Sequence, residues 1–252
     1  MPPKKAIGSL DDELLRKLLI VKQNEVRMMK ARGYSMEQDT EHQLLGMPFD
    51  NADEFLEMDL EDLKSYQDDD GEPFFKTRID FSTYYYTDPN DPKADTVWVL
   101  YPASLKGGPT KAEDLKVNIY PLLGSDKDKL GDLKKFPNQK IILISELGLS
   151  NEKKFVANAP AYQVSFFRFT ELAFNRLEHA YNPSQIKVIP KAEIKSWMKQ
   201  EGFTEYKNLP KVFSDDLVAK WMGAIPGDII EYHSLGLEYE SNIRYRYVIP
   251  RR

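Results

Sequence analysis

The side chains best suited to catalysis in this sequence are three carboxylates beside segments of strand-like composition, Asp80, Asp95 and Glu146. Carboxylates can hold a divalent ion that activates water, and some nucleases add a lysine two residues after the glutamate. Here Gly148 stands two residues after Glu146, so that lysine is missing. The pattern argues against a metal-dependent nuclease, which we keep as an alternative.

Other catalytic patterns are absent from the sequence. There is no cysteine, which excludes thiol catalysis, disulfides and cysteine-ligated zinc or iron-sulfur centres. The histidines, His42, His179 and His233, include no close pair that would begin a metal site. The glycine pair at residues 107–108 precedes no Gly-Lys-Ser/Thr, so we interpret it as a turn and not a phosphate loop. We therefore expect no catalytic residue, no metal and no cofactor.

Length and charge narrow the class of protein. With 252 residues, 41% of them hydrophobic, the chain can form one large domain or two ordinary ones, and we expect two. No apolar run approaches the roughly 20 residues that span a bilayer, and no apolar signal region follows the start, so we expect a soluble intracellular protein. The net charge of −5 argues against a protein that holds duplex DNA alone through a broad basic face.

Residues 1–174 have the pattern of an α/β domain. A helix is expected from about Leu10 to Arg32, capped by Ser9 with Asp12 three residues on, and closed by Gly33. A strand or a pair of strands is expected at residues 74–86. Further strands are expected at residues 97–101, 140–144 and 164–169, with helices at 112–123 and 152–158. This alternation is typical of a sheet covered by helices.

An acidic run lies inside this domain, from residue 50 to residue 72. It holds 11 acidic residues against one basic residue, Lys64. Its leucines have the spacing of a short helix, whereas the Asp-Asp-Asp-Gly sequence at residues 68–71 indicates a loop or a disordered segment. Because charge blocks commonly serve only as solvated surface, we interpret the run as a solvated insertion; an acidic docking arm or a cation site is the alternative.

Residues 209–232 contain the highest density of residues that begin or end helices, strands and turns. Pro210 fixes its own φ and removes a backbone donor, so a short strand is expected directly after it, at residues 211–213. Ser214 or Asp215 then offers a side-chain oxygen to the free amides of a helix of two or three turns. The stretch is therefore expected to begin as a strand followed by a capped helix.

The second half of this stretch predicts a returning strand. The helix carries an apolar stripe that includes Trp221, and Gly227 allows the positive φ of a tight turn before a strand resumes at residues 229–232. A further helix is expected at residues 191–201. Because prolines divide this part of the chain into short units, we assign residues 175–252 to a small α+β domain.

The tail of the chain alternates arginine and tyrosine. A strand at residues 243–248 would place Arg244 and Arg246 on one face and Tyr245 and Tyr247 on the other. Arginine and tyrosine are favoured at protein interfaces, so we interpret this tail as a surface for a partner. An ordinary solvated strand face is the alternative.

From about residue 139 to residue 248 the sequence resembles the fifth subunit shared by eukaryotic nuclear RNA polymerases, together with its archaeal equivalent. The features that carry the resemblance are Leu177-Glu178-His179, Pro183, Ile189-Pro190, Leu209-Pro210, Asp215, Trp221, Gly223, Gly227, Ile229-Ile230 and Tyr245-Arg246. The sequence departs from the family at residues 232–234 and 238–242, where the family has Arg-Pro and a later glycine. Its greater length and acidity suggest a divergent copy, such as one carried by a large DNA virus.

The resemblance implies a noncatalytic subunit of a multisubunit DNA-directed RNA polymerase. Residues 1–174 would form a jaw domain, a helix-covered mixed sheet of nuclease-like topology that reaches toward downstream duplex DNA. Residues 175–252 would form an assembly domain that docks on the largest subunit. The alternatives are a nuclease-fold enzyme fused to a binding module and a free-standing adaptor protein.

The resemblance also implies a set of residues at the partner interface. These are His179, Pro210, Asp215, Trp221, Gly227, Arg244, Tyr245 and Arg246. His179 has no acidic or nucleophilic partner in the sequence, so we interpret it as a structural residue hydrogen-bonded to backbone where the domains meet, and not as a catalyst. The expected location is the nucleus, or the cytoplasm or virion for a viral copy.

Overall fold

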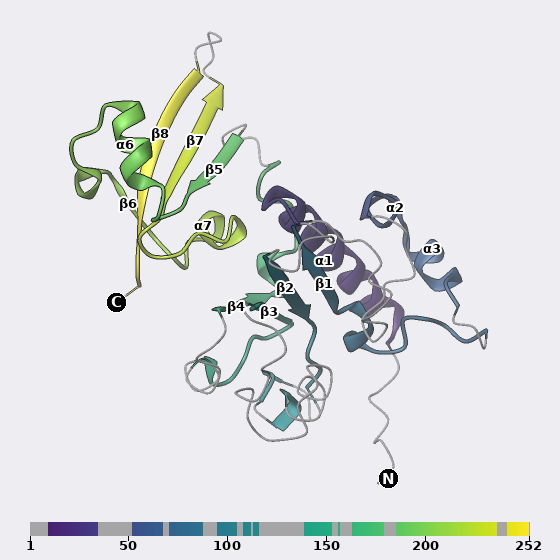
Figure 1. The fold of residues 1–252 in the computed structure, drawn as a ribbon. Coiled ribbons are helices and arrows are strands. Elements are labelled where there is room, and N and C mark those ends of the chain that lie inside the picture. The colour runs from purple at the N-terminus through teal and green to yellow at the C-terminus, as the bar shows by residue number, and fades with distance from the viewer. Residues whose placement is uncertain are drawn as a thin grey trace. The chain divides into compact units, whose positions relative to one another are not determined.

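The chain divides into two compact units, residues 1–174 and residues 175–252, and each contains a four-stranded sheet (Figure 1). The computed structural model describes residues 10–34, 52–67, 71–87, 95–104, 108–111, 113–115, 139–152, 156, 163–178, 185–235 and 241–251. Within these ranges, every helix is too short or too polar to cross a membrane.

The N-terminal unit is built around one long helix, α1 (Asp12–Ala31). Asp11 has an extended backbone, and its side chain accepts the backbone N–H of Leu14 at 2.8 Å, so Asp11 is the N-cap. Ser9, the cap that the sequence suggests, lies outside the described residues. Gly33 has a φ of +83° just beyond the helix, as expected for a closing glycine. The predicted helix is confirmed, with a different cap.

The sheet of this unit is mixed, as predicted. Its strands lie in the order β1 (Thr83–Tyr86), β2 (Thr96–Leu100), β3 (Gln139–Ser145) and β4 (Gln163–Arg168). β1 runs antiparallel to β2, whereas β2, β3 and β4 run parallel to one another. β2 and β3 come from continuous apolar runs because they are central strands, and Val97 and Ile141 have no exposed surface.

The strand predicted at residues 74–86 is wrong except at its end, where β1 lies. A 3-10 helix, η1 (Arg78–Phe81), precedes β1. The carboxylate of Asp80 accepts the backbone N–H of Thr77 at 2.5 Å. This local bond stabilises a turn in place of an extended chain.

Two helices that the sequence predicts between strands, at residues 112–123 and 152–158, lie mostly outside the described residues. Within them the structure describes residues 113–115, 152 and 156, which are helical. Both helices stay predictions beyond these positions.

The acidic run folds in part as two short helices, α2 (Ala52–Glu57) and α3 (Leu60–Ser65). Phe55 and Leu63 are buried at 0% and 1% exposure. The Gln23 side chain on α1 donates to the backbone carbonyl just after α2 at 2.9 Å, so this segment packs on α1 (Figure 1). The interpretation as a merely solvated insertion is therefore wrong for these helices, because two apolar side chains anchor them. The Asp-Asp-Asp sequence that follows lies outside the described residues.

The C-terminal unit has a sheet of four strands whose order in the sheet differs from their order in the sequence. Their order is β5 (Gln185–Ile189), β7 (Ile229–Leu235), β8 (Ser241–Ile249) and β6 (Lys211–Phe213). β6 runs parallel to β8, and the other pairs are antiparallel. The strand predicted at residues 211–213 is confirmed. β5 was not predicted, although its Gln-Ile-Lys-Val-Ile sequence alternates as a strand does.

Both faces of this sheet carry an apolar cluster. α6 (Ile194–Glu201) lies on one face, where Trp197 and Ile229 are buried. α7 (Leu217–Trp221) supplies Ala219 to the cluster on the other face, which contains Ile230. Ile229 and Ile230 serve opposite clusters because neighbouring side chains of a strand point to opposite faces. The unit therefore has two small cores, one under each helix; Figure 1 shows the two helices beside the sheet.

The cap of α7 is Asp216, so the prediction of Asp215 or Ser214 is wrong. The Asp216 carboxylate accepts the backbone N–H of Val218 at 3.0 Å, which satisfies a free amide of the first turn. The helix has 5 residues, fewer than the two or three turns predicted. It ends early because Gly223, with a φ of +71°, turns the chain away.

Candidate functional site

Two arginines and a tyrosine form an exposed strip on the sheet of the C-terminal unit. Arg244 and Arg246 lie on the same face of β8, and both are exposed. Tyr232 on β7 is the Cα partner of Arg244, and the Arg246 guanidinium lies 6.0 Å from the centre of the Tyr232 ring. We call these three residues the arginine strip. Among the described residues, neither arginine forms an ion pair with a carboxylate.

Tyr232 is the base of this strip and is half-buried. It packs against the apolar cluster under α7. Burial, followed by the nearby Asp216 carboxylate, raises the pKa of Tyr232 to about 12, while Arg246 acts in the opposite direction. The phenol is therefore neutral at physiological pH. Sequence reasoning missed Tyr232, because its position is clear only once β7 and β8 pair.

The tyrosines of the tail lie on the opposite face, as the alternation predicts. The Tyr245 ring lies 4.9 Å from Trp197 and 5.4 Å from Phe203, measured between ring centres. Its hydroxyl donates to Glu201 at 3.2 Å, and burial with the nearby carboxylates of Glu231 and Glu201 raises its pKa to about 12. Tyr245 therefore contributes to the core of its own unit, and its contact with a partner stays a prediction.

Three other predicted site residues are not part of the strip. Pro210 is exposed. Its carbonyl accepts the backbone N–H of Tyr247 at 2.9 Å, and this bond helps to fix the register of β6 with β8. Asp215 pairs with Arg251 at 2.5 Å beside a shallow groove. Trp221 has only 1% of its surface exposed. Trp221 therefore acts through the fold and offers no surface to a partner in this structure.

Gly227 has a role that its lack of a side chain explains. Its φ is +107°, and a Cβ at this position would lie 3.1 Å from the Lys191 side chain. Its backbone N–H donates to the carbonyl of Val248 at 3.0 Å. A larger residue would strain the turn and crowd Lys191. His179, the remaining predicted residue, lies outside the described residues.

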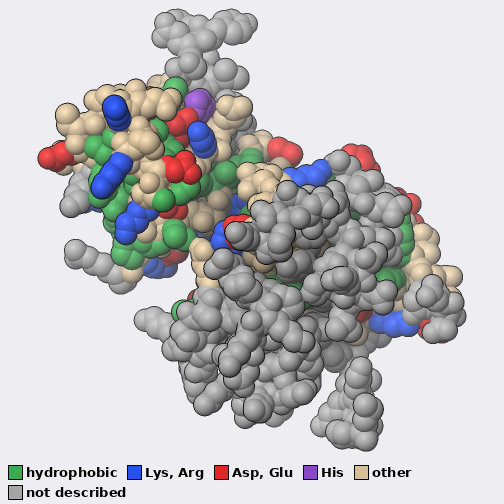
Figure 2. All heavy atoms as spheres, viewed as in Figure 1, with side chains coloured by type: hydrophobic (Ala, Val, Ile, Leu, Met, Phe, Trp, Pro, Cys, Tyr) green, Lys and Arg blue, Asp and Glu red, His purple; other side chains and the backbone are tan. Residues whose placement is uncertain are grey.

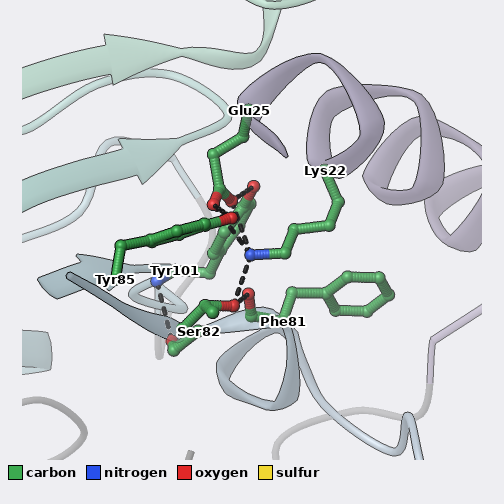
Figure 3. Close-up of polar contacts among 7 residues, drawn as sticks. Lys22, Glu25, Phe81, Ser82, Tyr85 and Tyr101 are labelled. Atoms are coloured by element: carbon green, nitrogen blue, oxygen red, sulfur yellow. Dashed lines mark hydrogen bonds and ion pairs between the residues drawn. The ribbon is translucent and has the colours of Figure 1, made fainter. Parts of the chain in front are cut away.

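A buried polar cluster joins α1 to the sheet of the N-terminal unit (Figure 3). The Lys22 ammonium donates to both carboxylate oxygens of Glu25 at 2.8 Å and to the Thr83 hydroxyl at 2.5 Å. The hydroxyls of Tyr85 and Tyr101 donate to the same carboxylate at 2.5 and 2.6 Å. Every donor of the lysine is thus used, and both carboxylate oxygens accept two bonds.

This cluster is built to hold structure and not to bind a substrate. Lys22 and Glu25 are both 0% exposed, so no ligand reaches them. Burial lowers the pKa of Lys22, an effect that Glu25 opposes, and burial raises the pKa of Tyr85 and of Tyr101 well above the ordinary value. Sequence reasoning missed this cluster. The sequence pattern that could have indicated the cluster is the i, i+3 spacing of Lys22 and Glu25 on the apolar side of a helix.

The carboxylates that a nuclease would need are held by separate partners. Glu146 pairs with Arg78 at 2.8 Å. Asp95 pairs with Lys140 and accepts the hydroxyl of Tyr34 at 2.6 Å. Asp80 accepts the backbone amide described above, and burial raises its pKa. Within the described ranges, no three His, Asp or Glu side chains converge on a point where a metal ion could sit.

Comparison with known proteins identifies the C-terminal unit. The family model for RNA polymerase Rpb5, C-terminal domain, matches residues 174–248, and the match therefore covers most of this unit. A search of curated proteins gives no match. By family, Rpb5 is a noncatalytic polymerase subunit. Residues 174–248 carry an Rpb5 C-terminal domain, and this match supports an Rpb5-like RNA polymerase subunit.

Proposed function

We propose that this subunit docks through its C-terminal unit on the largest subunit of a multisubunit DNA-directed RNA polymerase. We propose further that its N-terminal unit is part of the jaw near downstream duplex DNA, with a nuclease-like topology but no catalysis. The family match over residues 174–248 carries this proposal, because it falls on the unit that we assign to assembly. The location follows the polymerase: the nucleus, or the cytoplasm or virion if the chain is a viral copy.

The organisation of the C-terminal unit supports docking. Its two apolar clusters, one on each face of the sheet, use side chains from within the unit. The arginine strip remains exposed beyond α7 and offers two charges that no described carboxylate neutralises. Arginines in this situation are common anchors of protein interfaces. The unit can therefore bind a partner without rearranging its own cores.

The charge of the N-terminal unit argues against independent binding to duplex DNA. Of the 35 Lys and Arg and the 40 Asp and Glu in the chain, 23 and 30 lie in residues 1–174, leaving 12 and 10 in residues 175–252. The visible face of the C-terminal unit shows separate basic side chains among acidic and hydrophobic ones (Figure 2). Duplex binding depends on neutralised phosphates, so the large subunits would have to supply most of the contacts.

Purification of the native complex tests this function. A tagged copy of the full chain, expressed in its natural host, should copurify with the two largest polymerase subunits in stoichiometric amounts. The same preparation should lose neither subunit in moderate salt, since an assembly subunit is held by more than screened surface charges. Recovery of the chain as a stable monomer, with the polymerase complete without it, would contradict the proposal and favour a free-standing adaptor.

A further inference from the structure

We propose that the arginine strip binds an extended acidic segment of the partner subunit, in which two carboxylate side chains are spaced two residues apart. The inference rests on the proposed docking through the C-terminal unit and adds the chemistry of the partner. It follows from the spacing of Arg244 and Arg246, from their support by Tyr232, and from their lack of carboxylate partners in the described part of the chain.

Spacing is the first argument. Arg244 and Arg246 are two residues apart on β8, so their side chains leave the same face about 6.7 Å from each other. An extended partner chain has the same repeat. A Glu-x-Glu or Asp-x-Asp sequence therefore presents two carboxylates in register with the two guanidinium groups. Carboxylates on adjacent residues of an extended chain would point to opposite sides, and only one of them could reach the strip.

Support of the guanidinium groups is the second argument. The Arg246 guanidinium lies over the Tyr232 ring, which is half-buried against the cluster under α7. Arg244 stands directly across from Tyr232 in the register of β7 and β8. A fixed ring beneath a guanidinium restricts its motion, so less conformational freedom is lost when a carboxylate binds. The planar guanidinium can then donate two parallel hydrogen bonds to one carboxylate.

Availability of the charge is the third argument. Two other arginines of the chain are paired: Arg251 contacts Asp215 at 2.5 Å, and Arg78 contacts Glu146 at 2.8 Å. The acidic group whose charge acts on Tyr232 is Asp216. Its carboxylate already accepts hydrogen bonds from two backbone N–H groups as the cap of α7. It therefore stabilises the helix and does not pair with the arginines of the strip.

The width of the strip favours an extended segment. Tyr232 packs against the apolar cluster that contains Ala219 of α7, so this helix borders the strip on one side. A helix with its side chains is roughly 10 Å across, whereas an extended chain is narrower. The two arginines of the strip, which have no carboxylate partner among the residues that the structure describes, suit a pair of carboxylates better than the several phosphates of a nucleic acid.

Peptide binding to the full-length chain tests the inference. The probes are labelled peptides of equal length and equal glutamate content: alternating Thr and Glu, the same residues with the glutamates adjacent, and an alanine-rich helical peptide with glutamates four residues apart. Fluorescence anisotropy at low ionic strength should show about tenfold tighter binding of the alternating peptide than of either other peptide. R244Q/R246Q should abolish this preference, whereas Arg251→Gln, outside the strip, should keep it. Thermal melting of each variant shows whether it is folded.

Two results would overturn the inference. One is equal binding of the alternating and adjacent peptides by a folded wild-type chain. The other is tighter binding of the helical peptide, or of a single-stranded DNA oligonucleotide, than of the alternating peptide. Copurification of R244Q/R246Q with the polymerase separates a failure of the proposed docking surface from a failure of the proposed carboxylate spacing. If that variant is lost from the polymerase while the peptides are not distinguished, the docking surface stands and the spacing is wrong. If the folded variant assembles normally, the docking surface itself is wrong.

Discussion

Lys22 and Glu25 lie one helical turn apart on α1 and form an ion pair that no solvent reaches. Two contacts of 2.8 Å join them, and both side chains are 0% exposed. Thr83, Tyr85 and Tyr101 complete the cluster from the sheet side. The pair therefore fixes both the position and the rotation of α1 on the sheet of the N-terminal unit.

Removing one partner of this pair should be strongly destabilising. Glu25→Ala would leave the Lys22 charge buried and two tyrosine hydroxyls without an acceptor, at a cost of about 3–5 kcal/mol in the free energy of unfolding. Urea denaturation of the full chain measures this loss. The matched control is Glu13→Ala, which breaks the exposed Lys17 pair on the same helix and should change stability by less than about 1 kcal/mol. A small effect of Glu25→Ala would show that α1 does not depend on the pair.

Alkaline pH should weaken the fold. Tyr85 and Tyr101 have a raised pKa in the folded chain, chiefly through burial. Their stabilisation is complete below the unfolded pKa near 10 and is lost as the pH rises toward the folded pKa. Lys22 has a lowered pKa in the folded chain, so its titration makes the free energy of unfolding rise with pH. This effect ends at the pKa of lysine in the unfolded chain, near 10.5. Above about pH 10.5 the free energy of unfolding should therefore fall.

Urea midpoints at increasing pH measure this fall, which has a limit of about 1.4 kcal/mol per pH unit for each such tyrosine. Tyr85→Phe should be less stable near neutral pH, because a hydrogen bond to the Glu25 carboxylate is lost, yet should show a shallower decline above pH 10.5. An identical decline in wild type and variant would contradict the assignment.

Trp221 should be essential to the C-terminal unit. Trp221→Ala removes a side chain that is 99% buried and should cost about 3–5 kcal/mol, much of the stability of a unit this small. The control is Phe213→Ala, since Phe213 is 51% exposed and should tolerate the change. Thermal melting gives the stability, and copurification gives assembly. Normal melting of Trp221→Ala would contradict the placement of Trp221 in the core.

Fragments should divide the function between the two units. A fragment of residues 175–252 contains both apolar clusters of its unit and the arginine strip, so it should enter the polymerase on its own. A fragment of residues 1–174 lacks the strip and should not. Circular dichroism of each fragment checks that it is folded before assembly is scored. Assembly of the N-terminal fragment alone would place the interface on the wrong unit.

Local patterns were sufficient to predict the elements that depend on local chemistry. The helix at α1, the strand at residues 211–213 and the positive φ of Gly227 follow from capping, proline and glycine rules, and the structure confirms each. The central strands β2 and β3 were also predictable, because both are continuous apolar runs. In these cases a few neighbouring residues decide the backbone conformation.

Features that depend on partners distant in sequence were missed. The local sequence around Lys22 and Glu25 predicts only a helix. It does not show that Thr83, Tyr85 and Tyr101, each 60 or more residues from its partner in the sequence, meet them. Tyr232 joins the arginine strip only through the register of β7 with β8. The wrong cap of α7 has a local cause: Ser214, Asp215 and Asp216 are all good caps, and the chain geometry after β6 selects the last.

The docking claim is tested most directly by reversing the charge of the arginine strip in the full-length chain. R244E/R246E should melt within a few degrees of wild type, because both side chains are exposed, yet should no longer copurify with the two largest polymerase subunits. K195E/K199E makes the same charge change at exposed positions of α6, over the opposite face of the sheet, and should copurify as wild type does. Loss of R244E/R246E alone is the result that we predict. Recovery of folded R244E/R246E at wild-type levels would contradict docking through this face.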